Sequence, residues 1–322
     1  MMAKLSMIVP TYKRSNLINE LFENIENQKL KPSEIIIVDG TLSDDFSTEA
    51  VVREKRNNTN QEIIYLRHKK GTSTQRNAGI EIATGDYLAF IDDDIRLDNQ
   101  FFKNIIEVFQ DDIDFEIGGV TGYIENQFLD FNKSIHWRIY KTLKLFTTYN
   151  PGSYDYVSGY PINRYLQPPH EENRLIDFMG AGCVVWRKEV LLKGLRFSEY
   201  FTGYGVLEDA HFALRARKNW KLIECGKAKC KHLRSPIGRV DNEEIAFKSA
   251  VNYRYVFLDI VPEITIYNEF RFWLIQLFDL VRFILYFIIN PKIKNWLSIK
   301  GKVRGIIMAT NLRRDNYKTQ AF

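Results

Sequence analysis

Three consecutive aspartates, Asp92, Asp93 and Asp94, directly follow an apolar run at residues 87–91. An apolar run that ends abruptly in carboxylates predicts a buried strand whose last residues emerge at the carboxyl edge of a sheet, where open α/β folds bind ligands. Three neighbouring carboxylates repel one another unless a cation neutralises them. Oxygen ligands suit Mg²⁺ or Mn²⁺, which usually hold a substrate's phosphates. The pattern indicates a metal-dependent enzyme acting on a phosphate-containing substrate; the alternative is an acidic loop that only ends a strand.

The elements that must position these aspartates are strands alternating with helices. Apolar runs predict strands at residues 5–9, 35–38, 63–66 and 87–91. Helices are predicted between them at residues 16–28, 47–57 and 74–83. This alternation implies right-handed βαβ units and a parallel sheet. All four strands end in polar residues, so one sheet edge should collect Thr11, Asp39, the loop after Leu66 and the three aspartates. No G-x-G-x-x-G or P-loop occurs, so neither a dinucleotide oxidoreductase nor a P-loop NTPase is supported.

The rest of the chain divides into an irregular middle, a second ordered part and a helical end. Residues 118–175 are rich in Tyr, Asn, Gly and Pro, and we expect irregular loops that hold a partner-specific part of the site. Further strands are predicted at residues 183–186 and 221–224, and helices at 188–193 and 208–219. Long helical patterns without strands follow residue 235. We therefore expect a catalytic domain at residues 1–235 and a helical region at 236–322.

Charge and cysteine content limit the compartment and the partners. The net charge is +5, but residues 292–318 contain eight Lys or Arg and one acid, which indicates an anionic partner surface. No motif that reads RNA or DNA is present, so nucleic acid is not expected. Cys183, Cys225 and Cys230 are too few for a disulfide framework and, even with His232, match no common zinc pattern. No signal peptide is recognised, so we expect a cytoplasmic protein.

Six segments, in order, resemble the motifs of family 2 glycosyltransferases. They are SMIVPTYKR at 6–14, IIVDG at 36–40, GTSTQRNAG at 71–79, FIDDD at 90–94, MGAG through WRK at 179–188 and GYGVLED at 203–209. The resemblance covers about residues 5–232 and implies the GT-A fold, a Rossmann-like α/β fold with a mostly parallel sheet flanked by helices, here with a C-terminal helical extension. Two departures stand out. Asp39-Gly40-Thr41 replaces the frequent D-D-G-S, and Gln75 replaces a small residue.

The resemblance implies that a sugar moves from a nucleotide-diphosphate sugar to a hydroxyl of a glycan or lipid-linked acceptor, with inversion. Surface polysaccharide or glycolipid synthesis is the expected setting. Negative charge grows on the departing diphosphate, and a divalent cation, Mg²⁺ or Mn²⁺, would stabilise it. By resemblance the metal ligands are Asp94, Asp92 and His232, although a structural role for His232 remains equally open.

The same resemblance assigns the donor and acceptor sides. The residues expected to bind the donor are Pro10, Thr11, Tyr12, Asp39, Arg76, Asp92 and Asp93. Asp39 would meet the base or ribose, and the planar fork of Arg76 could pair with phosphates, unless Arg76 forms only a surface ion pair. Asp209 would be the base that deprotonates the acceptor hydroxyl, with Glu208 as its neighbour. The alternative is that these two acids only complement a helix dipole.

The C-terminal segment 268–289 is apolar and aromatic, but it contains Arg271, Gln276, Asp279 and Arg282. At helical spacing these polar residues fall within an arc of roughly 140°, so the helix is one-sided rather than a clean membrane span. With the basic residues that follow, it suits the surface of an anionic membrane and a lipid-linked acceptor. A helix that covers the catalytic core or forms a homo-oligomer interface is the open alternative.

Two other functions remain to be weighed. A sugar nucleotidyltransferase would share the sheet and the carboxylates, but it would usually carry a glycine-rich, basic loop after the first strand, which residues 10–14 do not form. A non-catalytic nucleotide-sugar-binding scaffold would bind the nucleotide without turnover. The presence of Asp92, Asp94 and Asp209 argues against the scaffold.

Overall fold

The structure is a computed structural model that describes residues 4–42, 44–59, 61–203, 205–235 and 241–317. Tyr204, within the GYGVLED segment, and the expected domain boundary at residue 236 lie outside the described residues. The helices are α1 (Ser15–Glu26), α2 (Ser47–Asn57), α3 (Thr72–Ile82), α4 (Phe101–Gln110), α5 (Ile135–Thr142), α6 (Lys188–Leu192), α7 (Glu208–Ala216), α8 (Asn242–Ile260), α9 (Ile266–Ile289) and α10 (Ile293–Thr310). The strands are β1 (Leu5–Thr11), β2 (Glu34–Asp39), β3 (Glu62–Arg67), β4 (Tyr87–Ile91), β5 (Ile95–Leu97), β6 (Ile117–Ile124), β7 (Tyr154–Asp155), β8 (Tyr160–Pro161), β9 (Asn173–Ile176), β10 (Cys183–Arg187) and β11 (Lys221–His232).

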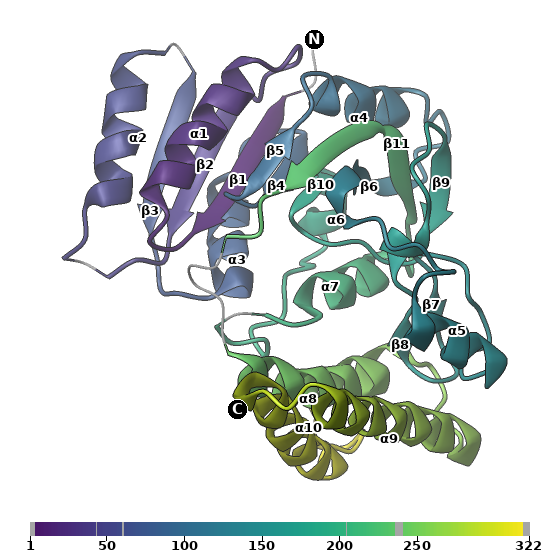
Figure 1. The fold of residues 1–322 in the computed structure, drawn as a ribbon. Coiled ribbons are helices and arrows are strands. Elements are labelled where there is room, and N and C mark those ends of the chain that lie inside the picture. The colour runs from purple at the N-terminus through teal and green to yellow at the C-terminus, as the bar shows by residue number, and fades with distance from the viewer. Residues whose placement is uncertain (1–3, 43, 60, 204, 236–240, 318–322) are drawn as a thin grey trace.

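One mixed sheet organises the upper part of the molecule (Figure 1). Among the described residues it has nine strands in the order β3-β2-β1-β4-β10-β6-β11-β5, with β9 also paired to β11. Strands β1 to β4 are parallel, and β10 runs antiparallel to both β4 and β6. This confirms the expected α/β fold with a mostly parallel sheet flanked by helices and a helical C-terminal extension.

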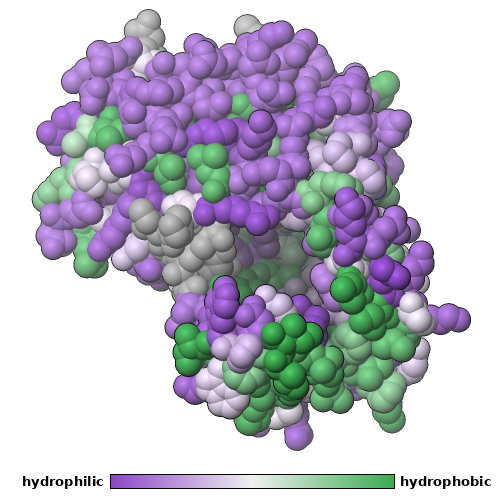
Figure 2. All heavy atoms as spheres, in the orientation of Figure 1, coloured by the Kyte–Doolittle hydropathy of each residue, from purple (hydrophilic) through white to green (hydrophobic). Residues whose placement is uncertain are grey.

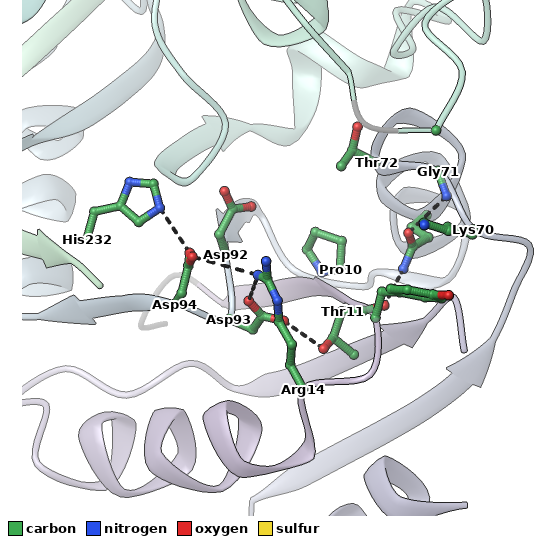
Figure 3. Close-up of a pocket in the computed structure, with 13 residues that line it drawn as sticks. Pro10, Thr11, Arg14, Lys70, Gly71, Thr72, Asp92, Asp93, Asp94 and His232 are labelled. Atoms are coloured by element: carbon green, nitrogen blue, oxygen red, sulfur yellow. Dashed lines mark hydrogen bonds and ion pairs between the residues drawn. The ribbon is translucent and has the colours of Figure 1, made fainter. Parts of the chain in front are cut away.

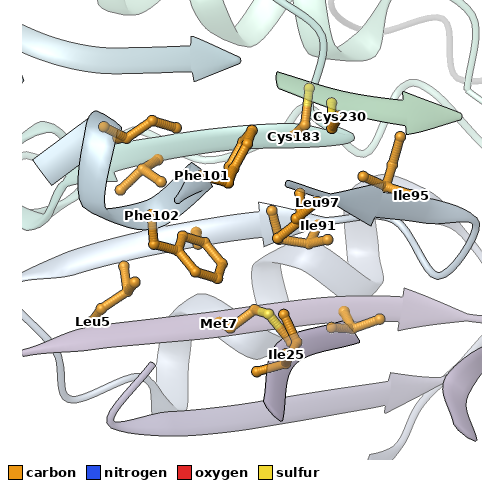
Figure 4. Packing of buried hydrophobic residues seen from close by; sticks show 14 of the residues in the cluster. Leu5, Met7, Ile25, Ile91, Ile95, Leu97, Phe101, Phe102, Cys183 and Cys230 are labelled. Carbon is orange, nitrogen blue, oxygen red and sulfur yellow. The ribbon is translucent and has the colours of Figure 1, made fainter. Parts of the chain in front are cut away.

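Apolar side chains on both faces of the sheet explain why its central strands are continuous apolar runs. Successive residues of β1 point to opposite faces: Met7 joins the cluster under α1 and α4, and Ile8 joins the cluster on the side of α3 and α7. Figure 4 shows the first cluster, in which Phe101 and Phe102 of α4 pack over the strands. Burial on both faces is typical of parallel strands and fixes the positions of the loops at their carboxyl ends.

The middle of the chain is more regular than expected. Strand β6 lies between β10 and β11 in the centre of the sheet, so the prediction that residues 118–175 are irregular is wrong at their beginning. The glycines of β6 explain both why the strand was not predicted and how it fits into the centre of the sheet. A Cβ at Gly119 would lie 2.3 Å from Met179 Cε, and one at Gly122 would lie 2.2 Å from Phe101 Cε2. The glycines lower the strand propensity of the sequence but are required by close packing.

The C-terminal helices are packed against the part of the chain that holds the sheet (Figure 1). One buried cluster joins Phe201 and Leu214, from the catalytic part, to Val256 of α8 and Phe272 of α9. The two predicted regions therefore share a hydrophobic core.

Candidate active site

A cavity of about 130 Å³ lies at the carboxyl ends of β1 and β4 (Figure 3). It is bounded by the three aspartates, the start of α3 and the end of β11. Its lining residues are Pro10, Thr11, Tyr12, Arg14, Lys70, Gly71, Thr72, Gln75, Asp92, Asp93, Asp94, Gly203 and His232. The edge of the sheet thus brings together most of the residues predicted to bind the donor and the metal.

Asp93 pins the end of β4 to the end of β1. Its carboxylate accepts a 2.7 Å hydrogen bond from Thr11 Oγ1 and lies 2.6 Å from Arg14 Nη1. Only 2% of Asp93 is exposed. Burial raises the pKa of Asp93 to about 6, against the opposing charge of Arg14. Both carboxylate oxygens are engaged within the protein, so the position of Asp93 suits holding the cavity's shape.

Asp94 and His232 face each other at the other end of the cavity. His232 Nε2 lies 3.2 Å from Asp94 Oδ1, and the backbone N–H of Ser235 donates to Asp94 Oδ2 at 3.0 Å. Burial acts to raise the pKa of Asp94, but the hydrogen bond and charge of His232 hold it below its usual range. The side-chain amide of Gln127 lies 2.6 Å from His232 Nδ1 and orients the ring. Asp94 therefore presents an ionised carboxylate to the cavity.

Asp92 points away from Asp94 and toward Arg76. Arg76 Nη2 lies 3.0 Å from Asp92 Oδ1, and Arg76 Nη1 lies 3.1 Å from Glu208 Oε1. Arg76 is 3% exposed, so the alternative of a surface ion pair is wrong. The guanidinium instead bridges carboxylates from β4 and α7; the predicted contact with donor phosphates stays a prediction. Gly182 makes room for Asp92, because a Cβ there would lie 2.9 Å from Asp92 Oδ2.

The predicted metal ligands line one cavity but are not gathered into a preformed cage. Over the described parts of the chain, no three His, Cys, Asp or Glu side chains are grouped so that they could hold a metal ion. The carboxylate of Asp94 suits either Mg²⁺ or Mn²⁺, and the imidazole nitrogen of His232 beside it would shift the preference toward Mn²⁺. Mg²⁺ commonly takes one or two carboxylates from a protein and its remaining ligands from phosphates and water.

The amino end of α3 faces the same cavity. Gln75 fixes its position: Nε2 donates to the carbonyls of Thr11 and Val38 at 2.9 and 2.7 Å, and Oε1 accepts from Gly71 N at 3.1 Å. The departure from the family's small residue is therefore a clamp that ties β1, β2 and α3 together. The helix dipole makes such an end favourable for anions.

Tyr12 lines the cavity, whereas Asp39 does not. Tyr12 lines the cavity, with Lys70 Nζ 4.0 Å from the centre of its ring, as expected of a wall for the nucleotide. Asp39 is fully buried at the end of β2. Its carboxylate accepts hydrogen bonds from Thr41 N at 2.9 Å and from the Tyr65 hydroxyl at 3.0 Å. Asp39 is not among the lining residues, and its contact with base or ribose stays a prediction.

Glu208 and Asp209 begin α7, directly after a strained residue. Leu207 has φ +75°, a left-handed conformation that is costly for a branched side chain. Glu208 is held by Arg76 and by Thr72 Oγ1, which donates at 3.3 Å. Burial raises the pKa of Asp209 to about 7, and the charge of Glu208 acts in the same direction. A carboxylate with a pKa near neutrality is suited to general-base catalysis.

Asp209 connects the donor side to a second, aromatic side. A cavity of about 230 Å³ is lined by Asp92, His232, Glu208 and Asp209 together. Asp209 also lines a larger cavity of about 510 Å³. Aromatic rings form much of the larger cavity's wall: His136 and Trp137 of α5, Tyr160, Tyr165, Phe178, and Tyr253 of α8. The three cavities adjoin one another through shared lining residues, and we refer to them together as the cleft. Its charged half consists of the first two cavities and its aromatic half of the third, and Asp209 lines both halves.

Several cleft residues were not identified from the sequence. Arg14 and Lys70 lie within or beside quoted motifs, and their basic character next to the aspartates was an available signal. Trp137, Tyr160 and Tyr253 match no motif. The only signal for the first two was the aromatic composition of the middle segment, and Tyr253 comes from the C-terminal region, where no motif was recognised.

Comparisons with known proteins agree with this geometry. The sequence model described as glycosyl transferase family 2 matches residues 6–167, which is half of the chain. Over 98 residues the chain is 37% identical to the GalNAc(5)-diNAcBac-PP-undecaprenol beta-1,3-glucosyltransferase of Campylobacter jejuni; the match covers 30% of this chain and 31% of that protein. The chain spans less than a third of the length of this relative and of two Rickettsia proteins named uncharacterized glycosyltransferases.

Solved structures extend the likeness in fold to nearly the whole chain. The mannosyltransferase PcManGT of Pyrobaculum calidifontis, in complex with GDP-Man and Mn²⁺, has a TM-score of 0.57 at 14% identity, covering 97% of this chain and 76% of that one. Residues 1–349 of S. aureus TarS, in complex with UDP-GlcNAc, have a TM-score of 0.54 at 18% identity, covering 95% and 81%. At these identities the similarity concerns the fold.

Proposed function

Because the chain belongs to glycosyl transferase family 2, we propose that it transfers a sugar from a nucleotide-diphosphate sugar to a hydroxyl of a glycan or lipid-linked acceptor. The observation that carries this proposal is the position of Asp209. It lines both a charged cavity and an aromatic cavity. A base in this position could take the proton of an acceptor hydroxyl in one cavity as that hydroxyl attacks the anomeric carbon of a donor in the other. The matches reported above are with glycosyltransferases, which favours this function over a sugar nucleotidyltransferase or a binding scaffold.

The donor would occupy the charged half of the cleft. Pro10, Thr11 and Tyr12 line the place proposed for the nucleotide, and the amino end of α3 with Lys70 faces the place proposed for the diphosphate. Asp94 and His232 would hold Mg²⁺ or Mn²⁺, which, when bound, neutralises charge on the departing diphosphate. Structures of similar fold contain a nucleotide sugar and, in one case, Mn²⁺, which supports this proposal in general terms.

The acceptor would occupy the aromatic half. Flat rings such as those of Trp137 and Tyr253 offer apolar faces to the C–H side of a pyranose, while polar groups orient its hydroxyls. Asp209 would take the proton of the attacking hydroxyl, and Arg76 would hold Glu208 and Asp92 on either side of the reacting centre. A single displacement from the face opposite the leaving group would invert the anomeric configuration.

The acceptor is proposed to be lipid-linked. The name of the Campylobacter jejuni relative specifies an undecaprenol diphosphate acceptor, which supports this choice. Synthesis of a surface polysaccharide or glycolipid, on the cytoplasmic face of a membrane, is the corresponding setting. Lipid-linked substrates are confined to membranes, so the enzyme would act in peripheral contact with one.

A panel of nucleotide sugars tests the proposal directly. The full-length protein is incubated with each donor and a polyprenyl diphosphate saccharide, with Mg²⁺, with Mn²⁺ or with EDTA, and the products are analysed by mass spectrometry and NMR. We expect one donor to be consumed only with a divalent ion and to give a product of inverted configuration. Asp94→Ala should lose most of this activity, whereas Asp114→Ala, which changes an exposed acid that lines none of the three cavities, should not. Release of pyrophosphate from a sugar phosphate and a nucleoside triphosphate would instead identify a nucleotidyltransferase.

A further inference from the structure

The polar side of α9 faces the protein interior. The buried residues of this helix include Gln276 and Asp279. Asp279 accepts a 2.7 Å hydrogen bond from the Tyr140 hydroxyl of α5 and lies 3.6 Å from Lys302 Nζ of α10, whose side chain is 1% exposed. Lys302 Nζ also donates to Gln276 Oε1 at 2.8 Å. The predicted polar arc is therefore real, and it attaches α9 to α5 and α10.

The opposite side of α9 is apolar and exposed. Eight side chains on this side have exposed fractions between 38% and 90%: Ile266, Tyr267, Phe270, Leu277, Val281, Ile284, Leu285 and Ile288. At 100° per residue they fall within an arc of roughly 100°, directly opposite the buried residues, and the arc contains no charged residue. Figure 2 shows hydrophobic side chains gathered over the lower part of the molecule, whereas the surface of the catalytic domain is largely hydrophilic.

This arrangement is the reverse of a water-facing helix, in which the apolar stripe faces the core. A contiguous apolar face of this size requires a partner. Among the described residues, α9 is the one helix long and apolar enough to cross a membrane: it has 24 residues, and its most apolar stretch of 18 residues has a mean hydropathy of 1.9. Crossing would strip Asp279 and Gln276 of Lys302 and Tyr140, which is costly in hydrocarbon. The helix can keep these contacts and still cover its apolar face only by lying flat against the partner.

The charges around this face identify the partner as an anionic lipid surface. Residues 266–310 contain seven Lys or Arg and two acids, and residues 131–149 contain four Lys or Arg and no acid. Both acids are engaged inward: Glu269 forms a two-point ion pair with buried Arg254 at 2.8 and 2.9 Å, and Asp279 faces Lys302. Lys292, just before α10, and Lys294, in its first turn, are exposed. A second copy of the chain would bring these cations against one another.

The neighbouring helices also carry exposed apolar residues. On α10, Ile293 and Trp296 are exposed, and Trp296 lies 5.9 Å from Phe287 of α9. Tryptophan is favoured at the boundary between lipid headgroups and acyl chains. Ile135 and Ile139 of α5 and Leu143, directly after it, are exposed at helical spacing, while Trp137 of the same helix lines the aromatic cavity.

We propose that the outer face of α9, with the start of α10, docks in the plane of an anionic bilayer. The apolar residues would enter the boundary between headgroups and acyl chains, and the surrounding lysines and arginines would meet the lipid phosphates. Because α5 borders both α9 and the aromatic cavity, docking would place the acceptor side of the cleft near the membrane. The docking itself does not depend on the chemistry that Asp209 performs.

Vesicle flotation of the full-length protein tests this proposal. We expect the protein to float with vesicles of phosphatidylcholine and phosphatidylglycerol, less with phosphatidylcholine alone, and less at high salt. Leu277→Glu/Leu285→Glu/Ile288→Glu should reduce flotation at least about tenfold. The matched control Leu42→Glu/Ile113→Glu/Leu192→Glu changes three exposed apolar residues of the catalytic domain to the same charge and should float normally. Thermal melts and hydrolysis of the nucleotide sugar should be unchanged in both variants, which separates docking from catalysis.

Three results would overturn the proposal. One is failure of the native protein to float with anionic vesicles. Another is a dimer in analytical ultracentrifugation that the Leu277, Leu285 and Ile288 variant dissociates, which would assign this face to a second copy. The third is resistance of the vesicle-bound protein to extraction at alkaline pH, which would indicate a spanning helix; a helix lying in the plane should be released.

Discussion

Two groups of buried charge in this molecule have similar compositions and different surroundings. Around the sheet edge, Asp92, Asp93 and Asp94 pair with Arg76, Arg14 and His232, and these side chains line cavities. Between the C-terminal helices, Asp279 pairs with Lys302 and Arg282. Neither Asp279 nor Lys302 lines any of the three cavities of the cleft. The comparison indicates that open space beside a charge, rather than the charge itself, distinguishes a site from a structural contact.

The largest expected effect belongs to Asp209→Asn. Loss of the base should lower the transfer rate by about 10² to 10⁴, while the affinity for the nucleotide, measured by calorimetry, stays close to the native value. Because Asp209 is a desolvated carboxylate beside Glu208, its removal should leave the free energy of unfolding unchanged or raise it at pH values above its pKa of about 7. A native transfer rate in this variant would exclude Asp209 as the base.

Lys302→Met should have the opposite effects, a loss of stability without a loss of turnover. Asp279 would lose a buried cation, so the free energy of unfolding should fall by about 3 kcal/mol, measured by urea denaturation. The turnover of the folded fraction should remain close to native, because Lys302 touches no part of the cleft. Lys300→Met on the same helix is the control: its side chain is 53% exposed and pairs with Glu243, so it should change stability by less than about 0.5 kcal/mol. Equal losses of unfolding free energy in the Lys302 and Lys300 variants would show that the buried contact with Asp279 is not what stabilises the helices.

The two halves of the cleft can be separated by a pair of tyrosine substitutions. Tyr253→Ala should raise the KM for the acceptor about tenfold, corresponding to ~1.4 kcal/mol, and leave the KM for the donor unchanged. Tyr12→Ala should do the reverse, because Tyr12 lines the donor cavity. Steady-state kinetics with each substrate varied in turn measures both values. Parallel changes in the two KM values would show that the division at Asp209 is wrong.

The smallest expected effect is on the pH profile. A base acts only when ionised, so kcat/KM should rise with pH and level off above the pKa of Asp209, about 7. Glu208→Gln removes a neighbouring negative charge and frees Arg76, and both changes lower the pKa of Asp209. The acidic limb should therefore move to lower pH by less than about one unit. If the acidic limb of the kcat/KM profile does not move in Glu208→Gln, that limb reports the ionisation of a group other than Asp209.

The sequence was sufficient for the parts of the fold that depend on local pattern. The four apolar runs are strands β1 to β4, and their carboxyl ends bring Thr11 and the three aspartates to one edge, because parallel strands place their ends together. Strand β11 was predicted to end at residue 224 and instead continues to His232. Its second half alternates Lys with buried Ala228 and Cys230, which is the pattern of a strand with one buried and one exposed face, and the prediction stopped before it.

Contacts between distant segments could not be predicted. Arg76 is close in sequence to Asp92, but its burial depends on Glu208, 132 residues away. Gln75 reads as a mild departure from a motif, and only the fold shows that its amide reaches the carbonyls of two strands. For α9 the polar arc was visible in the sequence, but its direction depends on Lys302 and Tyr140, which lie on other helices.

The contact between Asp279 and Lys302 has a consequence for the order of events during synthesis. The chain leaves the ribosome from its N-terminus, so Asp279 and its neighbour Arg282 emerge before Lys302, the buried cation of α10 that faces Asp279. Until α10 follows, α9 is an apolar helix with an exposed carboxylate, a poor substrate for lateral insertion into a bilayer. Pairing of the two helices would then bury the carboxylate against Lys302 and leave the apolar arc of α9 outside. Folding would therefore precede arrival at the lipid surface, and the finished protein would attach to it reversibly.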